Sequence, residues 1–149
     1  MDIKDKNARS KNMAAIRSKD TRPEIYFRKL IFSRGYRYRK NDSQIVGHPD
    51  LFLKKYNTAI FVHGCYWHRH NSCKYAYQPK SREDFWTAKF KKNMERDLVV
   101  REQLYADRIK CLIIWECTIR KMKKSEVYRD EVIQKTIDFL SSSELYLEI

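Results

Sequence analysis

Residues 48–64 read HPDLFLKKYNTAIFVHG, and this stretch predicts two neighbouring strands joined by a tight turn. Leu51 to Leu53 form the first predicted strand, and the polar segment KKYN turns the chain. Ala59 to Val62 form the second, an apolar run suited to a strand that is buried on both faces. The pair predicts part of a sheet, against which helices from the rest of the chain can pack.

A helix is predicted before these strands. The segment TRPE, which begins at Thr21, places threonine at the N-cap, proline in the first turn and glutamate three residues after the cap. The alternating stretch GYRYR, residues 35–39, then predicts a short strand. Apolar residues support the helix up to Gly35: Ile25, Tyr26, Leu30 and Phe32.

Two helices and one strand are predicted after the pair. The segment SRED opens a long helix from Ser81 to about Ala106, and its apolar residues fit a helical period only roughly. The stretch KCLIIWEC, residues 110–117, predicts a buried strand. This order predicts a mixed α/β domain, with a central mixed sheet flanked by helices. The last helix, residues 125–140, has an apolar stripe of Val127, Val132, Ile133, Ile137 and Leu140.

Length and charge indicate the kind of partner. The 149 residues predict one domain, residues 21–149, behind a basic arm, residues 1–20, with a short helix near its end. The net charge of +13 favours nucleic acid over an anionic membrane surface, since no apolar run approaches the ~20 residues of a spanning helix. A merely soluble charged surface is the alternative. The N-terminus lacks the apolar core of a signal peptide, so a cytoplasmic location and reduced thiols are expected.

The stretch FVHGCYWHRHNSC, residues 61–73, concentrates residues that bind metals. Cys65, His70 and Cys73 offer three ligands, and Cys117, just after a predicted strand, could return to supply the fourth of a tetrahedral zinc site. The alternative is a set of separate buried cysteines and a surface histidine. Cys111 lies inside an apolar strand and is predicted to be a small core residue.

A second group of residues suits phosphodiester hydrolysis. Asp50 follows a proline at the start of a strand, where many α/β nucleases place a Mg²⁺ ligand, and Glu24 lies in the early helix as a further carboxylate. The usual acidic-x-Lys motif is absent from the next strand. A backbone carbonyl near Val62 could complete the site, with His63 or His68 as the base. In the alternative interpretation, Asp50 only caps a turn, and His63 is a histidine at the end of a strand whose side chain makes a local hydrogen bond.

Large aromatic residues lie within the same region. Tyr66 and Trp67 stand between a proposed zinc ligand and a candidate base, and Trp86 is near the start of the long helix. Rigid rings at a surface can wedge between base pairs, at a cost of a few kcal/mol per unstacked step that new stacking offsets. Ordinary core packing is the alternative for each ring.

Several motifs together resemble the very short patch repair (Vsr-type) DNA mismatch endonucleases. They are SKNMAAIRSKDTRPE, GHPDLF, FVHGCYWHRH, FWTAKFKKNMERD and LIIWEC, and the resemblance covers residues 8–120. It implies a restriction-endonuclease-like core with a structural zinc ion. It also implies an enzyme that nicks one DNA strand 5′ to the thymine of a T·G mismatch, which arises when 5-methylcytosine is deaminated.

The resemblance also implies roles for individual residues. Asp50 and the carbonyl of Val62 would hold Mg²⁺, His68 would be the general base, and Glu24 and His63 would hold the water shell of the metal. The implied zinc ligands are Cys65, His70, Cys73 and Cys117. The implied DNA contacts are Tyr66, Trp67 and Trp86 in the major groove, Met13 in the minor groove, and Lys89 and Asn93 near the mismatch.

Three features depart from the family pattern: Val62 replaces threonine, Tyr66 replaces phenylalanine, and the stretch HRHNSC is one residue longer. A related nuclease with another site preference is one alternative function. A catalytically silent, zinc-stabilised DNA-binding module is another. Double-stranded DNA with a T·G mismatch is the expected partner of a monomer associated with a prokaryotic nucleoid, and other mismatch-repair proteins are candidate partners.

Overall fold

A five-stranded mixed sheet forms the centre of the protein, whose computed structural model describes residues 19–149. The strand order is β1-β2-β3-β4-β5, with β1–β2 and β2–β3 antiparallel and β3–β4 and β4–β5 parallel. The strands are β1 (Arg39–Lys40), β2 (Leu51–Leu53), β3 (Thr58–His63), β4 (Lys110–Trp115) and β5 (Tyr146–Glu148). The prediction for residues 48–64 is confirmed, because η1 (Lys54–Tyr56) and a left-handed Asn57 turn the chain between β2 and β3.

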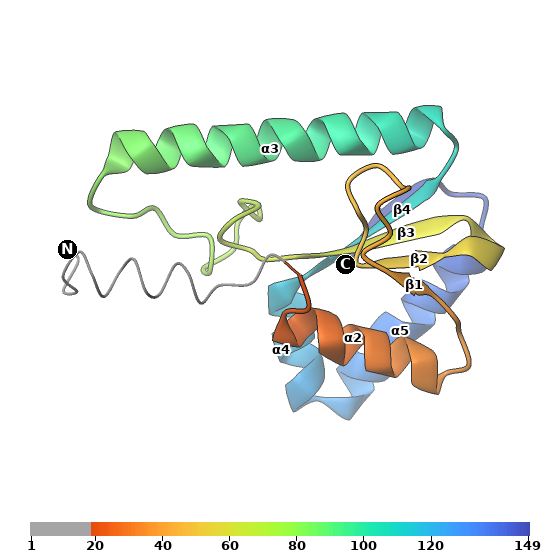
Figure 1. Cartoon of the computed structure of the whole chain (residues 1–149). Coiled ribbons are helices and arrows are strands. Elements are labelled where there is room, and N and C mark those ends of the chain that lie inside the picture. Colours follow the sequence, from red (N-terminus) through yellow and green to blue (C-terminus); the bar gives the residue numbers. More distant parts are fainter. Residues whose placement is uncertain (1–18) are drawn as a thin grey trace.

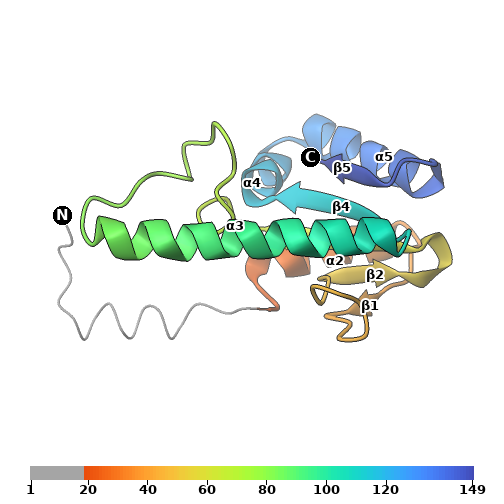
Figure 2. The same ribbon diagram turned by 90° about the horizontal axis from the view of Figure 1, so that it is seen from above.

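Helices cover both faces of this sheet, as the sequence predicts. The helices α2 (Arg22–Ser33), α4 (Glu116–Lys124) and α5 (Glu126–Ser141) lie on one face, and α3 (Glu83–Ala106) lies on the other (Figure 1). Figure 2 shows that the first half of α3 extends beyond the strands. Only Phe90 and Leu104 of α3 are buried, which explains why its apolar pattern fits a helical period poorly.

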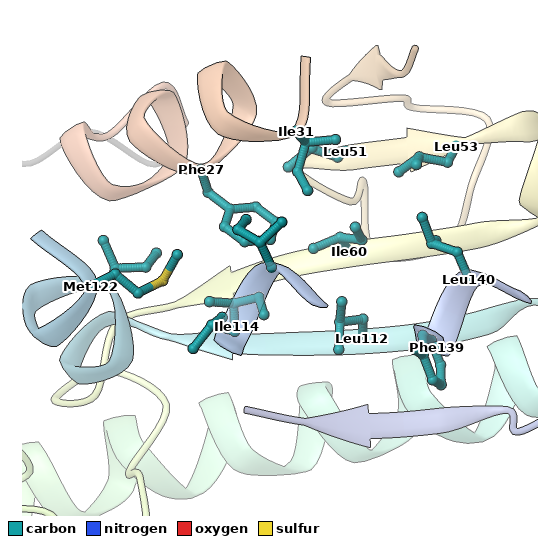
Figure 3. Close-up of a cluster of buried hydrophobic side chains, with 13 residues drawn as sticks. Phe27, Ile31, Leu51, Leu53, Ile60, Leu112, Ile114, Met122, Phe139 and Leu140 are labelled. Atoms are coloured by element: carbon teal, nitrogen blue, oxygen red, sulfur yellow. The ribbon is translucent and has the colours of Figure 1, made fainter. Parts of the chain in front are cut away.

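The core has two apolar layers, one on each face of the sheet. Side chains of β4 alternate between them: Leu112 and Ile114 join the layer under α2, α4 and α5, whereas Ile113 and Trp115 join the layer under α3. Figure 3 shows the first layer, in which Phe27 and Ile31 of α2 approach the strands. Cys111 is 3% exposed within the second layer, so its prediction as a core residue is confirmed.

The start of α2 confirms the predicted N-cap but corrects its buried face. The Thr21 side chain accepts a hydrogen bond from the backbone N–H of Glu24 at 3.5 Å, and Pro23 lies in the first turn. The carboxylate of Glu24 accepts from the backbone N–H of Asp20 at 2.7 Å rather than from that of Thr21. The face toward the sheet consists of Glu24, Phe27, Arg28 and Ile31, whereas Ile25 and Phe32 are 37% and 53% exposed.

Other element boundaries differ from the predictions. The strand predicted at residues 35–39 is wrong for most of its length, because β1 covers only Arg39–Lys40. The helix predicted from Ser81 begins at Glu83, after a left-handed Arg82. The strand predicted to Cys117 ends at Trp115, where α4 begins, and neither α4 nor β5 was predicted. Val127, predicted to lie on the apolar stripe of the last helix, is 71% exposed.

Lys110, at the start of β4, closes the end of α5. Its side chain is buried, and its ammonium donates to the carbonyls of Phe139, Leu140 (3.2 Å) and Ser142 (2.7 Å). These carbonyls belong to the last turn of a helix and the residue after it, where no further turn supplies donors, although the Phe139 carbonyl also accepts from the backbone N–H of Ser142 at 3.1 Å. The ammonium therefore ties α5 to the sheet.

Substitution of this lysine should destabilise the fold. We expect Lys110→Met to lower the free energy of unfolding by about 2 kcal/mol, because buried carbonyls would lose a charged donor. Urea unfolding followed by circular dichroism measures the change. Lys135→Met, at an exposed position of α5, is the control and should stay within about 0.5 kcal/mol of wild type. Equal effects of the two substitutions would contradict this role.

Candidate active site and metal centre

The parallel pairing of β3 with β4 brings Cys65 and Cys117 together. His63 lies opposite Trp115 at the carboxyl ends of these two strands. Cys65 and Cys117 each follow two residues later, so both leave the sheet at the same end. The backbone N–H of Cys117 donates to the Cys65 sulfur at 3.3 Å. Chain segments 52 residues apart therefore meet at one point.

The loop after β3 brings two further ligand atoms to this point. His70 Nδ1 lies 3.4 Å from Cys117 Sγ, and the imidazole stacks on the Trp115 ring with centroids 4.1 Å apart. Cys73 completes the group, in which the four ligand atoms lie within 4.8 Å of one another. His70 and Cys73 thus both reach the group, whose three sulfurs and one nitrogen could hold a metal ion.

The protonation of these thiols depends on a cation. Burial raises the pKa of Cys65 to about 12. This sulfur is therefore a neutral thiol when no cation is bound to it. Burial also acts to raise the pKa of Cys73, but hydrogen bonds from the Tyr75 backbone and from the neighbouring thiols lower it below its usual range. A bound metal ion would stabilise the thiolate forms of both residues.

The antiparallel pairing of β2 with β3 positions Asp50. Leu51 pairs with Ile60, so the preceding residue faces the end of β3, and Asp50 Oδ2 accepts from the backbone N–H of Val62 at 2.6 Å. Burial, and next the charge of Glu24, raise the pKa of Asp50 to about 7. Two carboxylates held close together in a buried place are a suitable environment for a divalent cation.

Arg28 links the two carboxylates to the scaffold. Its guanidinium donates to Glu24 Oε2 at 3.0 Å, to the backbone carbonyl of Asp50 at 3.3 Å and to Asp20 Oδ1 at 2.7 Å. The arginine is 4% exposed. It thereby fixes α2 against the start of β2, and its charge partly offsets the two acidic groups.

His68 has a carboxylate partner that the sequence did not reveal. Its Nδ1 lies 2.6 Å from Asp97 Oδ2, which comes from the middle of α3. The His68 ring stacks on that of His63 with centroids 3.8 Å apart and planes 6° apart. Burial, followed by the adjacent His68, lowers the pKa of His63 to about 3, so His63 is neutral at physiological pH.

Six aromatic side chains form one cluster between the loop and α3. The Tyr66 ring lies between 5.0 and 5.8 Å from the rings of Trp67, Tyr77, Trp86 and Phe90. Phe85 adjoins Trp86 at 5.3 Å. We call Tyr66, Trp67 and Trp86 the aromatic wedge, and all three are half-buried.

A cleft of about 1010 Å³ joins most of the predicted site residues. Asn93, predicted to contact bases, lines it and donates its side-chain N–H to the Trp67 carbonyl at 3.1 Å. Met13 lies outside the described residues. Tyr66 and Trp86 lie beside the cleft rather than on its wall. The wall includes Glu24, Asp50, Val62, His63, Trp67, His68, Lys89, Asn93 and Asp97.

Sequence reasoning missed Arg28 and Asp97. Each lies on a helix among other charged residues, and nothing in its local pattern separates it from a solvent-facing side chain. The motif FWTAKFKKNMERD contains Asp97, but only tertiary structure brings that carboxylate to His68.

Asp50 and His63 should affect stability in opposite directions as pH changes. Between about pH 4 and 6.5 the folded state keeps a proton on Asp50 that the unfolded state releases. The contribution of Asp50 to the free energy of unfolding therefore decreases as pH rises. His63 stays neutral when folded but binds a proton when unfolded, so its contribution increases with pH.

Two variants separate these effects. We expect the free energy of unfolding to rise more steeply with pH in Asp50→Asn than in wild type, and less steeply in His63→Gln. Denaturant titrations across this pH range, in Mg²⁺-free buffer, measure the slopes. Slopes equal to that of wild type would contradict the assignment.

Comparison with known proteins identifies DNA-cleaving enzymes as the relatives of this chain. A family profile described as DNA mismatch endonuclease Vsr matches residues 1–74. The chain is 45% identical over 119 residues to the type II nicking enzyme V.NmeAIP of Neisseria meningitidis serogroup A, an alignment that covers 80% of this chain and 84% of that protein. It is 39% identical over 123 residues to the DNA mismatch endonuclease Vsr of Escherichia coli K12, covering 83% and 78%. Within residues 19–149, none of the helices is long and apolar enough to cross a membrane.

Proposed function

Because the chain belongs to the family of Vsr DNA mismatch endonucleases, we propose that it nicks one DNA strand 5′ to the thymine of a T·G mismatch, in a Mg²⁺-dependent reaction. The chain is a DNA endonuclease, and the proposal concerns its lesion and its metal. The mismatch would be the product of 5-methylcytosine deamination. The observation that carries the proposal is the shared cleft, which holds Asp50, Glu24 and His68 beside an aromatic loop.

Asp50 and the backbone carbonyl of Val62 are the proposed Mg²⁺ ligands, with Glu24 and His63 holding water around the ion. The raised pKa of Asp50 supports this assignment, because burial and the neighbouring Glu24 disfavour the charged carboxylate despite Arg28, and a bound cation would stabilise it. When bound, Mg²⁺ would polarise the scissile phosphate and offset charge on the leaving oxygen. The side chain at position 62 is not used, so valine serves there as well as threonine.

His68 is the proposed general base. With the Nδ1 proton donated to Asp97, the remaining ring nitrogen carries a lone pair and can take a proton from the attacking water. This tautomer is assigned from the Asp97 contact. The neutral His63 ring beside it adds no competing charge.

Asp97 should matter for activity without touching DNA. We expect Asp97→Asn to lower the nicking rate about 100-fold at saturating DNA, because an amide no longer favours the productive tautomer of His68. Single-turnover kinetics measure the rate, and fluorescence anisotropy measures DNA affinity. Glu95→Gln, at an exposed position on the same helix, is the control. An Asp97→Asn rate within twofold of the control would contradict this role.

Zinc is the proposed ion at Cys65, His70, Cys73 and Cys117. Sulfur and imidazole ligands in a closed group of four suit a structural Zn²⁺ ion. Such an ion would hold the loop that carries Tyr66 and Trp67. We propose that the fold around this zinc site is a restriction-endonuclease-like core, and the mixed sheet supports that assignment.

The aromatic wedge is proposed to enter the major groove at the mismatch. Half-buried rings supported by other rings can unstack a base step without losing their own packing. Lys89 and Asn93 would contact bases near the mismatch. Residues 1–20 would form a basic arm that clamps the duplex, with Met13 in the minor groove, and residues 21–149 the endonuclease domain. The enzyme would act as a monomer in the prokaryotic cytoplasm, at the nucleoid, with other mismatch-repair proteins as further partners.

A nicking assay tests this function. Duplexes labelled on one strand would carry T·G or C·G at one position, in several flanking sequences, with or without Mg²⁺. The proposal expects a nick only at T·G and only with Mg²⁺. Equal cutting of both duplexes would support a related nuclease with another site preference. Binding without cutting in any duplex would support a non-catalytic DNA-binding module.

A further inference from the structure

Arg69 lies between two residues that serve different sites. The preceding His68 contacts Asp97, and the following His70 reaches Cys117. Arg69 has a φ of 52°, in the left-handed region that few residues other than glycine adopt. This backbone conformation turns the chain, so that the imidazoles of His68 and His70 can face different partners. The Arg69 side chain itself lies against α3, over the Phe90 ring.

The guanidinium of Arg69 joins two parts of the loop. Nη1 donates to the Tyr66 carbonyl at 3.1 Å, and Nη2 donates to the carbonyls of Ala76 and Tyr77 at 2.8 and 3.1 Å. One side chain therefore holds the segment that carries Tyr66 against a segment about ten residues further along the chain. Each contact joins a charged donor to a backbone acceptor, which is stronger than a neutral hydrogen bond.

The same guanidinium also fastens the loop to α3. Its central carbon lies 4.0 Å from the centroid of the Phe90 ring and 5.5 Å from that of Tyr66. Phe90 is buried at 5% exposure and belongs to the helix that carries Trp86. Cation–π contact of this kind orients the cation over the ring. Arg69 thereby connects both chain segments from which the aromatic wedge is built.

We propose that Arg69 is a positioning residue that keeps the aromatic wedge rigid enough to open a base step. This role rests on the proposed mismatch endonuclease function. Unstacking a base step costs a few kcal/mol, so a loop that yields under this load would leave the DNA stacked. The planar fork of arginine reaches three carbonyls while it covers a ring, and the compact ammonium of lysine cannot reproduce that geometry.

The first test uses the protein without DNA. Acrylamide quenching of tryptophan fluorescence reports the mobility and exposure of Trp67 and Trp86, since Trp115 is 8% exposed. Arg69→Met and Arg69→Lys should both increase quenching relative to wild type, with metal content unchanged. The lysine variant keeps the charge and the aliphatic stem, and serves if the methionine variant folds poorly. Unchanged quenching in the folded variant would overturn the proposal, whatever the lesion that the enzyme recognises.

The second test measures what the wedge does to DNA. A T·G duplex with 2-aminopurine beside the mismatch would be saturated with each protein, and its fluorescence increase recorded as a measure of unstacking. We expect a smaller increase in both Arg69 variants and a kcat lower by about 10- to 100-fold, because misplacement of a positioning group slows the step that depends on it. KM should change much less than kcat. A kcat equal to that of wild type, despite increased quenching, would overturn the proposal.

A matched control separates geometry from charge. Arg82 also stacks on a ring of the cluster, with its guanidinium carbon 4.3 Å from the Phe85 centroid. Arg82→Gln removes the same charge near the wedge and should leave the 2-aminopurine signal close to that of wild type. A loss equal to that of the Arg69 variants would overturn the proposal in favour of general electrostatic attraction. If wild type itself neither unstacks nor nicks the T·G duplex, the proposed function fails, while the quenching result still decides whether Arg69 holds the loop.

Discussion

Replacement of Asp50 by alanine should lower the nicking rate at least about 10³-fold, because metal-ion catalysis supplies several kcal/mol and each 1.36 kcal/mol corresponds to a factor of ten. Asp50 accepts from the Val62 backbone and lies beside the buried Glu24, so its replacement removes one of the two carboxylates of the proposed metal site. DNA affinity should change little, since Asp50 directly precedes β2, whereas the aromatic wedge lies on the loop after β3 and on α3. Single-turnover nicking at saturating DNA and Mg²⁺ measures the rate.

A matched control keeps this test specific. Asp138→Ala removes an exposed carboxylate from α5, which does not line the cleft, and should nick at the wild-type rate. Fluorescence anisotropy with the same duplex shows whether binding persists. An Asp50→Ala enzyme that nicks within tenfold of this control would remove Asp50 from the metal site, and Glu24 would become the leading carboxylate for the same ion.

Replacement of Cys117 by alanine should have the largest effect on stability. The residue contributes one of four ligand atoms gathered from segments 52 residues apart. A structural zinc ion binds with an apparent free energy of about 10–16 kcal/mol, and loss of even part of it should lower the unfolding midpoint by about 10 °C or more. Elemental analysis of purified protein should fall from about one zinc ion per chain to near none.

Cys111, the cysteine outside the ligand group, provides the control. Cys111 is buried under α3, apart from the ligand group, and burial raises its pKa to about 12. Cys111→Ala should keep its zinc and lose about 1 kcal/mol of stability, as is common for a small core truncation. Wild-type protein without zinc, or equal zinc loss in both variants, would rule out the proposed zinc ion at Cys65, His70, Cys73 and Cys117.

The local pattern was sufficient for most of the fold. Alternation and apolar runs predicted β2, β3 and β4, and cap residues predicted the start of α2, because these signals arise from neighbours in the chain. The short strand β5 and the helix α4 escaped prediction. A three-residue strand depends on the partner that it pairs with, and α4 begins within a motif that reads as a continuing strand.

Ligand types were also predictable, since cysteine, histidine and aspartate near strand ends are chemically specific. The residues that orient them were not. Asp97, Arg28 and Arg69 are ordinary charged side chains in a strongly basic sequence, and their partners lie far away along the chain or on backbone atoms. A backbone carbonyl as a partner leaves no trace in the sequence.

The sequence by itself determined β2, β3 and β4, the chemistry of the ligands and the aromatic content of the loop, because each depends on residue type and spacing. Only the tertiary structure decided which atoms meet. The parallel register of β3 and β4 brings Cys65 to Cys117, the antiparallel register of β2 and β3 aims Asp50 at Val62, and the position of α3 across the sheet gives His68 its carboxylate. Such contacts follow from strand pairing and helix packing over the whole chain, which no short stretch of sequence contains.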